Sequence, residues 1–134
     1  MAKPMNVFDI AGRAMSAQLV RLNTTASNLA NAGSISGTKE NAFRSLKPVF
    51  ETVTDRAGVA TVGVSRVVQA EVEPVKRHQP GHPLADANGD VWEAGVDTSA
   101  ELIDMVESAR QYQNNVQVLQ TAKTLTLDTL RLGQ

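Results

Sequence analysis

The sequence lacks cysteine entirely, so it can form no disulfide bond and offers no thiolate for catalysis or for a cysteine-rich zinc site. It also lacks an excess of charge of either sign, since the formal net charge is −1 over 134 residues. A nearly neutral chain gives no electrostatic reason to expect nucleic acid or an anionic membrane as a partner. We therefore expect no nucleic-acid partner and no thiol chemistry.

Long hydrophobic runs are absent as well. The stretch 1–12 contains Lys3 but is interrupted by Pro4, Asn6 and Asp9, so it lacks the continuous apolar segment of a secretory signal peptide. No later stretch is long enough to span a bilayer. We expect a soluble chain without direct membrane insertion, and any export must use a route that needs no cleaved signal peptide.

An apolar repeat predicts a first long helix that ends near residue 32. Four apolar residues share a seven-residue spacing, namely Phe8, Met15, Leu22 and Leu29. This spacing places them along one face of a helix. Asn6 is placed to cap the start, and Gly33 is placed to end the helix in a left-handed conformation. A helix of about 25 residues would be roughly 38 Å long.

A second and longer helix is predicted from Thr98 to about residue 132. Thr98 and Glu101 match a capping box, although Asp97 could cap the helix instead, and Gly133 is placed to end it. Apolar residues keep a spacing of three and four along this stretch; they include Leu102, Met105, Ala109, Tyr112, Val116, Leu119 and Leu130. About 34 residues would extend on the order of 50 Å, which exceeds the diameter of a small domain.

Both predicted helices are poor in charge, although an exposed helix face usually carries charged residues. Between Gln111 and Thr129 the only charged residues are Lys123 and Asp128, and the other polar residues are amides and hydroxyls. Such side chains are mediocre helix formers, so neither helix should be stable alone in water. Neutral polar faces therefore indicate that the two helices pack against further helices in an assembly. The alternative interpretation is an ordinary pair of helices whose exposed faces happen to be neutral.

The middle of the chain predicts a small β-rich insert. Small apolar residues alternate with polar ones over 62–72, and a second strand is expected over 46–53, where Pro48 indicates a sheet edge. Residues 55–58 fit the turn between these strands. We expect 33–38 to be a flexible linker and the stretch 79–91, rich in proline and glycine, to be a rigid irregular loop.

The expected fold class is α+β, in which long N- and C-terminal helices pair as an antiparallel coiled coil with a small β-rich insert between them. Residues 1–33 would form the N-terminal helical arm, 34–96 the insert with its Pro/Gly-rich loop, and 97–134 the C-terminal helical arm. The two arms would form one domain. The first arm is net basic and the second net acidic, which weakly favours their pairing.

The loop and its flanks hold the only patterns that imitate a chemical site. His78, His82 and Asp86 have the spacing of metal ligands on a helix, but the prolines between them exclude that helix. The acidic residues from Asp86 onward imitate a calcium loop, yet Val91 stands where that loop requires glycine. Acidic residues in such a stretch are typical of turns. We therefore expect no catalytic residue, no metal ligand and no cofactor.

Four segments of the chain are similar to bacterial flagellar rod and hook proteins. The first is residues 6–32, which end in RLNTTASNLANA; the others are QPGHPLAD at 79–86, SARQYQNNV at 108–116 and TLRLG at 129–133. The resemblance extends over nearly the whole chain, and these segments together narrow it to the proximal rod proteins. The chain departs from the pattern of that family at Asp90, Ala94 and Gly95.

The resemblance implies a structural subunit of the flagellar basal body and not an enzyme. Members of the family are exported unfolded through the flagellar type III apparatus without a cleaved signal peptide. They stack into a rod that crosses the periplasm and transmits torque, with the paired terminal helices inside and the β insert outside. The implied partners are other copies of the chain, the other proximal and distal rod subunits, and the export apparatus.

The residues expected to carry helix packing and assembly lie on both arms. They are Phe8, Met15, Leu22, Asn28, Leu29 and Asn31 in the first arm, and Leu102, Met105, Ala109, Tyr112, Asn115, Val116, Leu119 and Leu130 in the second. Two other classes of protein stay open. A coiled-coil adaptor or secreted interaction protein would need arms that are charged and folded in the free protein. A wall-lytic enzyme, the weaker alternative, would need a cleft that holds two carboxylates.

Overall fold

The computed structural model describes residues 6–134, so the part of the predicted N-terminal arm at residues 1–5 lies outside the described residues. The elements in chain order are α1 (Val7–Ala30), β1 (Ile35–Ser36), β2 (Leu46–Thr54), β3 (Ala60–Gln69), β4 (Val75–His78), β5 (Asp90–Glu93) and α2 (Thr98–Leu132). Two long helices therefore enclose a β-rich insert in the sequence, which confirms the predicted α+β class.

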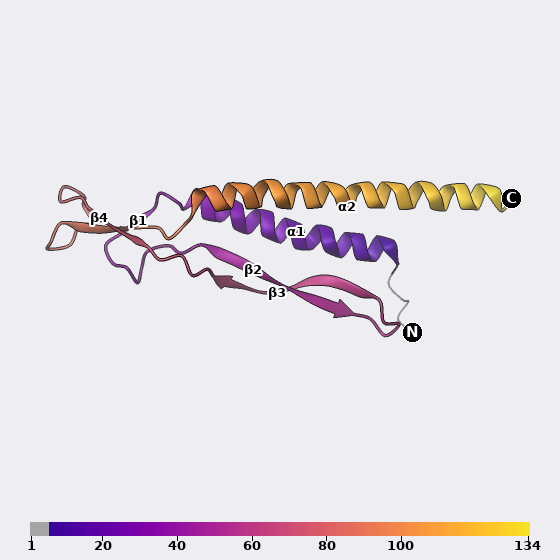
Figure 1. The fold of residues 1–134 in the computed structure, drawn as a ribbon, viewed down its shortest axis with the longest axis horizontal. Helices are drawn as coiled ribbons and strands as arrows, with labels where there is room; N and C mark the ends of the chain where they lie inside the picture. Colours follow the sequence, from indigo (N-terminus) through magenta and orange to yellow (C-terminus); the bar gives the residue numbers. More distant parts are fainter. Residues whose placement is uncertain (1–5) are drawn as a thin grey trace.

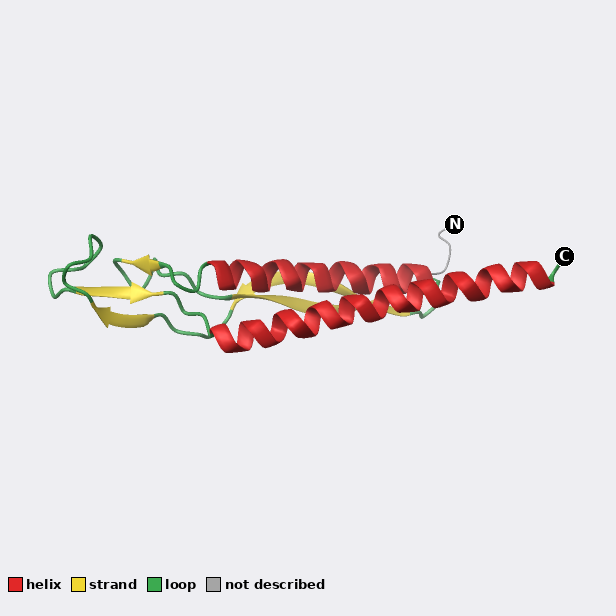
Figure 2. Ribbon diagram, turned by 90° about the horizontal axis from the view of Figure 1, so that it is seen from above, coloured by secondary structure: helices red, strands yellow, loops and turns green. Residues whose placement is uncertain are grey.

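Helix α1 is the central element of an elongated molecule (Figure 1). It packs against α2 on one side and against the hairpin of β2 and β3 on the other. α1 runs toward the insert, and α2 runs back from it and continues past the first turn of α1 (Figures 1 and 2). Among the described residues, 123–134 are therefore all exposed. No helix in the described part of the chain has the length and apolar character needed to cross a membrane.

The start of α1 is fixed by a complete capping box. The side-chain oxygen of Asn6 accepts hydrogen bonds from the backbone N–H groups of Phe8 at 2.9 Å and Asp9 at 3.1 Å. The carboxylate of Asp9 in turn accepts a hydrogen bond from the N–H of Asn6 at 3.1 Å. This pattern satisfies N–H groups that have no partner inside the helix. The predicted role of Asn6 is confirmed.

The end of α1 differs from the prediction. Helix α1 stops at Ala30 with Asn31 as its C-cap, and Gly33 does not adopt a positive φ, so the prediction that Gly33 ends the helix in a left-handed conformation is wrong. The side-chain amide of Asn31 donates to the carbonyl oxygen of Ser27 at 2.8 Å, as does its backbone N–H at 3.1 Å. The Asn31 side chain therefore adds a second hydrogen bond to a carbonyl in the last turn of α1.

The start of α2 follows the alternative that the sequence left open. Asp97 is the N-cap, and its side-chain oxygen accepts from the backbone N–H of Ala100 at 3.1 Å. The capping box of Thr98 and Glu101 is therefore not formed, because Thr98 is already the first residue of the helix. Gly133 is the C-cap, as predicted. The Glu101 side chain is left free of any capping role.

Strands β2 and β3 form the predicted hairpin. They pair antiparallel from Leu46 opposite Gln69 to Thr54 opposite Ala60, with a shift of register between Val49 and Phe50. Gly58 in the turn has a φ of +82°, a conformation that favours glycine. The two predicted strands and the turn between them are confirmed, and both strands are sheet edges because this sheet has only two strands.

Three strands of the insert were not predicted. β4 pairs antiparallel with β5, and β1 pairs with the other edge of β5, which gives a three-stranded sheet of order β1–β5–β4. β1 lies in the stretch expected to be a linker, so that expectation is wrong. β5 begins inside the expected irregular loop, which shortens that loop to 79–89. Strands of two to four residues carry no readable alternation, and their pairing is decided by contacts distant in the sequence.

The insert rejoins the helices at a crowded crossing around Gly95. The N–H of Ser45 donates to the carbonyl of Gly95 at 3.0 Å, and the N–H of Gly95 donates to the carbonyl of Phe43 at 2.7 Å. A Cβ atom at position 95 would overlap the carbonyl oxygen of Val72. Only glycine fits this crossing without movement of the backbone.

Candidate assembly interface

The faces of α1 and α2 that are buried within the subunit consist of small and polar residues. On α1 the buried residues are Ala11, Ala17, Thr25 and Asn28, and on α2 they are Glu101 and Ser108. In the whole described part of the chain, the buried apolar residues other than Pro74 are Ala11, Ala17, Ala42, Val91 and Ala94. Four alanines and one valine remove little apolar surface from water. The isolated subunit therefore has only a small hydrophobic core.

One buried residue of the predicted set, Asn28, fastens the insert to α1. Asn28 is 1% exposed. Its side-chain amide donates to the carbonyl of Leu46 at 2.9 Å, and its side-chain oxygen accepts from the N–H of Leu46 at 2.8 Å. These two bonds satisfy both backbone groups of the first residue of β2. Asn28 thus connects α1 to the hairpin inside the subunit.

The other predicted residues of α1 lie beside this buried face. Met15, Leu22 and Leu29 are half-buried, whereas Phe8 is exposed. Asn31, also half-buried, is used in the C-cap described above. Each of the apolar side chains therefore keeps surface that a neighbouring molecule could cover, and their role in assembly stays a prediction.

Most of the predicted residues of α2 are half-buried. These are Met105, Ala109, Tyr112, Asn115, Val116 and Leu119. The side-chain amide of Asn115 donates to the carbonyl of Gln111 at 2.9 Å, so this amide is used within its own helix. Leu102 and Leu130 are exposed. Their part in assembly is likewise a prediction.

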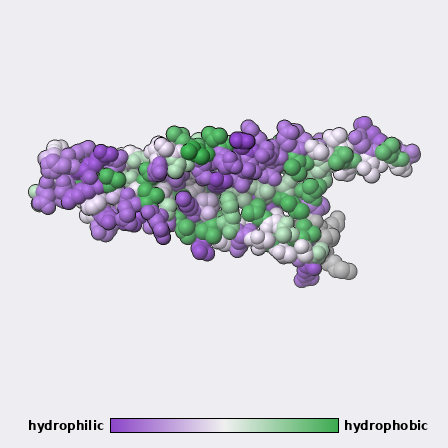
Figure 3. All heavy atoms as spheres, viewed as in Figure 1, coloured by the Kyte–Doolittle hydropathy of each residue, from purple (hydrophilic) through white to green (hydrophobic). Residues whose placement is uncertain are grey.

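Large apolar side chains on α2 form two exposed groups. The group near the start of the helix is Leu102, Ile103 and Val106, and the group toward its end is Val118, Leu125, Leu127, Leu130 and Leu132. Figure 3 shows apolar patches over the start of α2 and further ones near the C-terminal end. Ile103 is 71% exposed and Leu132 is 88% exposed. Soluble monomers rarely expose so many large apolar groups on one element.

Of these eight side chains, the predicted set contains only Leu102 and Leu130. The other six lie off the stripe from which the predicted residues of α2 were chosen. Apolar residues on more than one face of a helix are typical of a helix that is covered on more than one side. That signal was present in the sequence.

An apolar groove of about 510 Å³ lies where the start of α1 faces the later part of α2. Its apolar lining is Val7 from α1 with Val118, Ala122 and Leu125 from α2, and the remaining lining residues are Gln117, Thr121 and Thr126. The residues of α2 that line the groove directly precede the exposed C-terminal turns of the same helix. The groove and these turns together form one stretch of apolar surface that the subunit itself does not cover.

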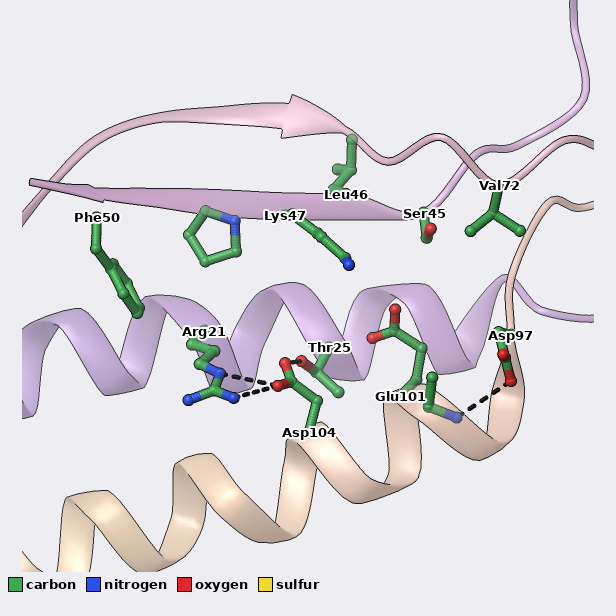
Figure 4. Close-up of a pocket in the computed structure, with 12 residues that line it drawn as sticks. Arg21, Thr25, Ser45, Leu46, Lys47, Phe50, Val72, Asp97, Glu101 and Asp104 are labelled. Atoms are coloured by element: carbon green, nitrogen blue, oxygen red, sulfur yellow. Dashed lines mark hydrogen bonds and ion pairs between the residues drawn. The ribbon is translucent and has the colours of Figure 1, made fainter.

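An ion pair joins the two helices near the other end of α1. The Nε of Arg21 donates to Oδ1 of Asp104 at 3.0 Å, and the hydroxyl of Thr25 donates to Oδ2 at 3.2 Å (Figure 4). The hydrogen bond from Arg21 lowers the pKa of Asp104 below its ordinary value, and the same contact raises the pKa of Arg21. Both oxygens of Asp104 are therefore occupied within the subunit.

The residues that imitated a chemical site are engaged in the structure of the β4–β5 hairpin. Nδ1 of His78 lies 3.0 Å from Oδ1 of Asp90, and Nζ of Lys76 lies 3.1 Å from the other oxygen. The hydrogen bond with His78 and then the one with Lys76 lower the pKa of Asp90. The carboxylate of Asp86 accepts from the N–H groups of Asn88 at 2.8 Å and Asp90 at 2.9 Å, which is turn-forming geometry.

Trp92 lies in β5 and is half-buried. The ammonium nitrogen of Lys39 lies 5.9 Å from the centre of its ring. This distance is within the range of a cation–π contact. Trp92 thus contacts a side chain of the insert itself.

Two family models match the two helical arms. Residues 8–33 match the model described as flagella basal body rod protein, and residues 87–132 match the model described as flagellar basal body rod FlgEFG protein C-terminal. These segments contain nearly all of α1 and the whole of α2, the elements that carry most of the exposed large apolar side chains.

Individual relatives match the chain over almost its full length. The chain is 44% identical over 132 residues to the flagellar basal-body rod protein FlgC of Salmonella typhimurium, covering 97% of this chain and 98% of that protein. It is 47% identical over 133 residues to the FlgC protein of Yersinia enterocolitica, with 97% and 98% covered. A third FlgC protein, from Buchnera aphidicola subsp. Schizaphis graminum, is 36% identical over 135 residues with 97% and 98% covered.

Proposed function

Since the chain belongs to the FlgC family of flagellar basal-body rod proteins, we propose that it polymerises through its two terminal helices. A member of this family is a structural subunit of the rod and not an enzyme. In this proposal the helices of neighbouring subunits pack together into the drive shaft that crosses the periplasm and transmits torque. Many contacts of the head-to-tail kind would hold such a filament together.

The observation that carries the proposal is the balance between buried and exposed apolar side chains. The described part of the chain buries four alanines and one valine, whereas eight large apolar side chains of α2 are exposed. Covering such side chains with neighbouring subunits would supply the hydrophobic stabilisation that the isolated subunit lacks. A free adaptor protein would instead need polar side chains at these positions.

The finer packing that we propose is an antiparallel coiled coil of α1 and α2. A seven-residue spacing links Ala11, Gln18 and Thr25 on α1, and Glu101, Ser108 and Asn115 on α2, all of them buried or half-buried. This spacing is typical of helices that wrap around each other. The opposite directions of the two helices in Figure 1 are compatible with this arrangement.

The proposed partners are other copies of the chain, the other proximal and distal rod subunits, and the flagellar type III export apparatus. Export in an unfolded state requires that the subunit unfold at little cost. A small apolar core supports this, because hydrophobic burial is the main term that opposes unfolding. Export without a cleaved signal peptide belongs to the same proposal.

Leu130 offers a direct test of assembly through α2. It is 62% exposed, so Leu130→Asp removes little packing from the subunit itself. The full-length variant would be produced in a strain that lacks the wild-type chain, and secretion, isolated basal bodies and swimming would be measured. We expect normal secretion with loss of complete rods and of motility, because an aspartate would be left unpaired in a packed helix interface.

Leu130→Met is the matched control, since it keeps an apolar side chain of similar volume. It should assemble and swim normally. Normal motility of Leu130→Asp would contradict the proposal that this face of α2 is buried in the rod.

A further inference from the structure

A cavity of about 430 Å³ lies at the junction of α1, β2 and the start of α2 (Figure 4). Residues from all three elements line this junction pocket; they include Arg21, Lys47, Pro48, Phe50, Glu101 and Asp104. Glu101 is only 7% exposed, and its carboxylate points from α2 into the pocket toward β2. Among the described residues it has no hydrogen-bond or ion-pair partner. The carboxylate lines an open cavity, so a cation that enters the pocket can reach it.

We propose that the junction pocket receives a basic side chain from an adjacent rod subunit, whose ammonium or guanidinium group pairs with Glu101. This inference rests on the proposed function, because it needs a neighbouring subunit. It adds a polar contact of defined position to the apolar helix packing described above.

The neighbouring acidic residues already have hydrogen-bond partners within the subunit, so Glu101 is the carboxylate of the pocket that is available to a partner from outside. Asp104 accepts hydrogen bonds from Arg21 and Thr25. Asp97 accepts the N–H of Ala100 and caps α2. Because Asp97 caps the helix, the Glu101 side chain is not needed for the capping box that its sequence position indicates.

The chemistry of the walls favours a charged group on an apolar stem. Leu46, Pro48, Phe50 and Val72 supply apolar surface along the cavity. The Glu101 carboxylate points into the same cavity from α2 (Figure 4). Lysine and arginine bury their methylene stems against apolar surface and keep the charged head for a carboxylate. A bare metal ion would need several free oxygen ligands, and the described residues contain no group of three acidic or histidine side chains that could hold one.

Lys47 of the same chain is the competing partner for Glu101. It lies in β2, is exposed and lines the junction pocket, but no ion pair joins it to Glu101 in the structure. If Lys47 were the true partner, Lys47→Met and Glu101→Gln would impair the protein alike. If the partner comes from a neighbour, Lys47→Met should assemble normally.

The first experiment compares Glu101→Gln with Glu107→Gln in the full chain, in a strain that lacks the wild-type chain. Glu107 is a matched control, since it lies on the same helix and accepts a hydrogen bond from Gln111 at 3.0 Å. We expect Glu101→Gln to be secreted normally and to give at least about tenfold fewer basal bodies with a complete rod, as when one partner of a buried pair is removed. Glu107→Gln and Lys47→Met should match the wild type.

The second experiment identifies the incoming side chain. A photo-reactive amino acid at the exposed position Ala100, which lines the junction pocket, would be activated in isolated basal bodies, and the captured peptide would be sequenced by mass spectrometry. We expect a peptide from another subunit with a lysine or arginine at the captured site. Normal rods with Glu101→Gln, a shared defect with Lys47→Met, or capture only within the same chain would overturn the inference.

The outcomes separate this inference from the proposed function. If Leu130→Asp blocks the rod while Glu101→Gln assembles normally, the helices polymerise but the junction pocket receives no basic side chain. If Leu130→Asp also assembles normally, the proposed role of α2 fails as well.

Discussion

Arg21 in α1 and Asp104 in α2 are 83 residues apart in the sequence, yet the Nε of Arg21 donates to Oδ1 of Asp104 at 3.0 Å. Within residues 6–134 this is the one ion pair that joins the two helices. It fixes which turn of α1 lies beside which turn of α2, since a shift by one turn would separate the two side chains. The small side chains elsewhere on the buried faces of α1 and α2 restrict a shift of one helix along the other much less.

The first prediction concerns the pH dependence of this pair. The hydrogen bond from Arg21 lowers the pKa of Asp104 below its ordinary value of 3.8, so the carboxylate binds a proton less readily in the folded subunit than in the unfolded chain. Its contribution to the free energy of unfolding is therefore complete above the ordinary value and is lost as the pH falls through the lowered pKa. The side chain of Asp104 is 39% exposed, so solvent screening limits the contribution to about 1 kcal/mol or less.

Urea unfolding of the purified subunit and of Asp104→Asn at several pH values checks this prediction. The difference between the two free energies of unfolding should stay constant from about pH 7 to pH 5 and vanish well below pH 4. A difference that grows as the pH falls would contradict the assignment, because it would require a raised pKa for Asp104.

The second prediction concerns Asn28. Asn28→Leu would leave the N–H and the carbonyl of Leu46 without their partner, and we expect the free energy of unfolding to fall by about 2–3 kcal/mol. Limited proteolysis should then cut the hairpin of β2 and β3 first, because its connection to α1 is lost. Asn23→Leu is the control, since Asn23 is exposed on the same helix. Equal stability of the two variants would show that the bonds to Leu46 contribute little.

The long helices could be predicted from the sequence because their signals are local. The apolar spacing, the Asn6 cap and the position of Gly133 each depend on residues within one or two turns. The hairpin of β2 and β3 was equally accessible, since its alternation and its turn lie in one continuous stretch.

The remaining features depend on residues that are distant in the sequence. β1 pairs with β5 across more than fifty residues, and two residues of strand carry no pattern that would reveal this pairing. The role of Asn28 depends on the position of Leu46, and the isolation of Glu101 depends on Asp97 taking the capping role. The sequence predicts Asn28 as a helix-packing residue but contains no local signal that identifies Leu46 as its hydrogen-bond partner.

The third prediction uses the crowded crossing at Gly95. Gly95→Ala would place a methyl group against the carbonyl oxygen of Val72, so the backbone must shift and the free energy of unfolding should fall by about 1–3 kcal/mol. Gly12→Ala is the control, because a Cβ at position 12 in α1 meets no atom within 4 Å. That change should raise the free energy of unfolding by about 0.5–1 kcal/mol through the higher helix propensity of alanine. Thermal unfolding measures both, and a stable Gly95→Ala variant would contradict the crossing.

The last prediction concerns Asp86 in the loop between β4 and β5. Its carboxylate accepts the N–H groups of Asn88 and Asp90, so we expect it to support the turn and not to bind a metal ion. Asp86→Asn keeps a side-chain oxygen that can accept both bonds, whereas Asp86→Ala loses them and should lower the free energy of unfolding by about 1–2 kcal/mol. The metal content of the wild type and of both variants should stay at background in elemental analysis. Stoichiometric zinc or calcium in the wild type that disappears in Asp86→Ala would replace the turn-forming role with a metal site.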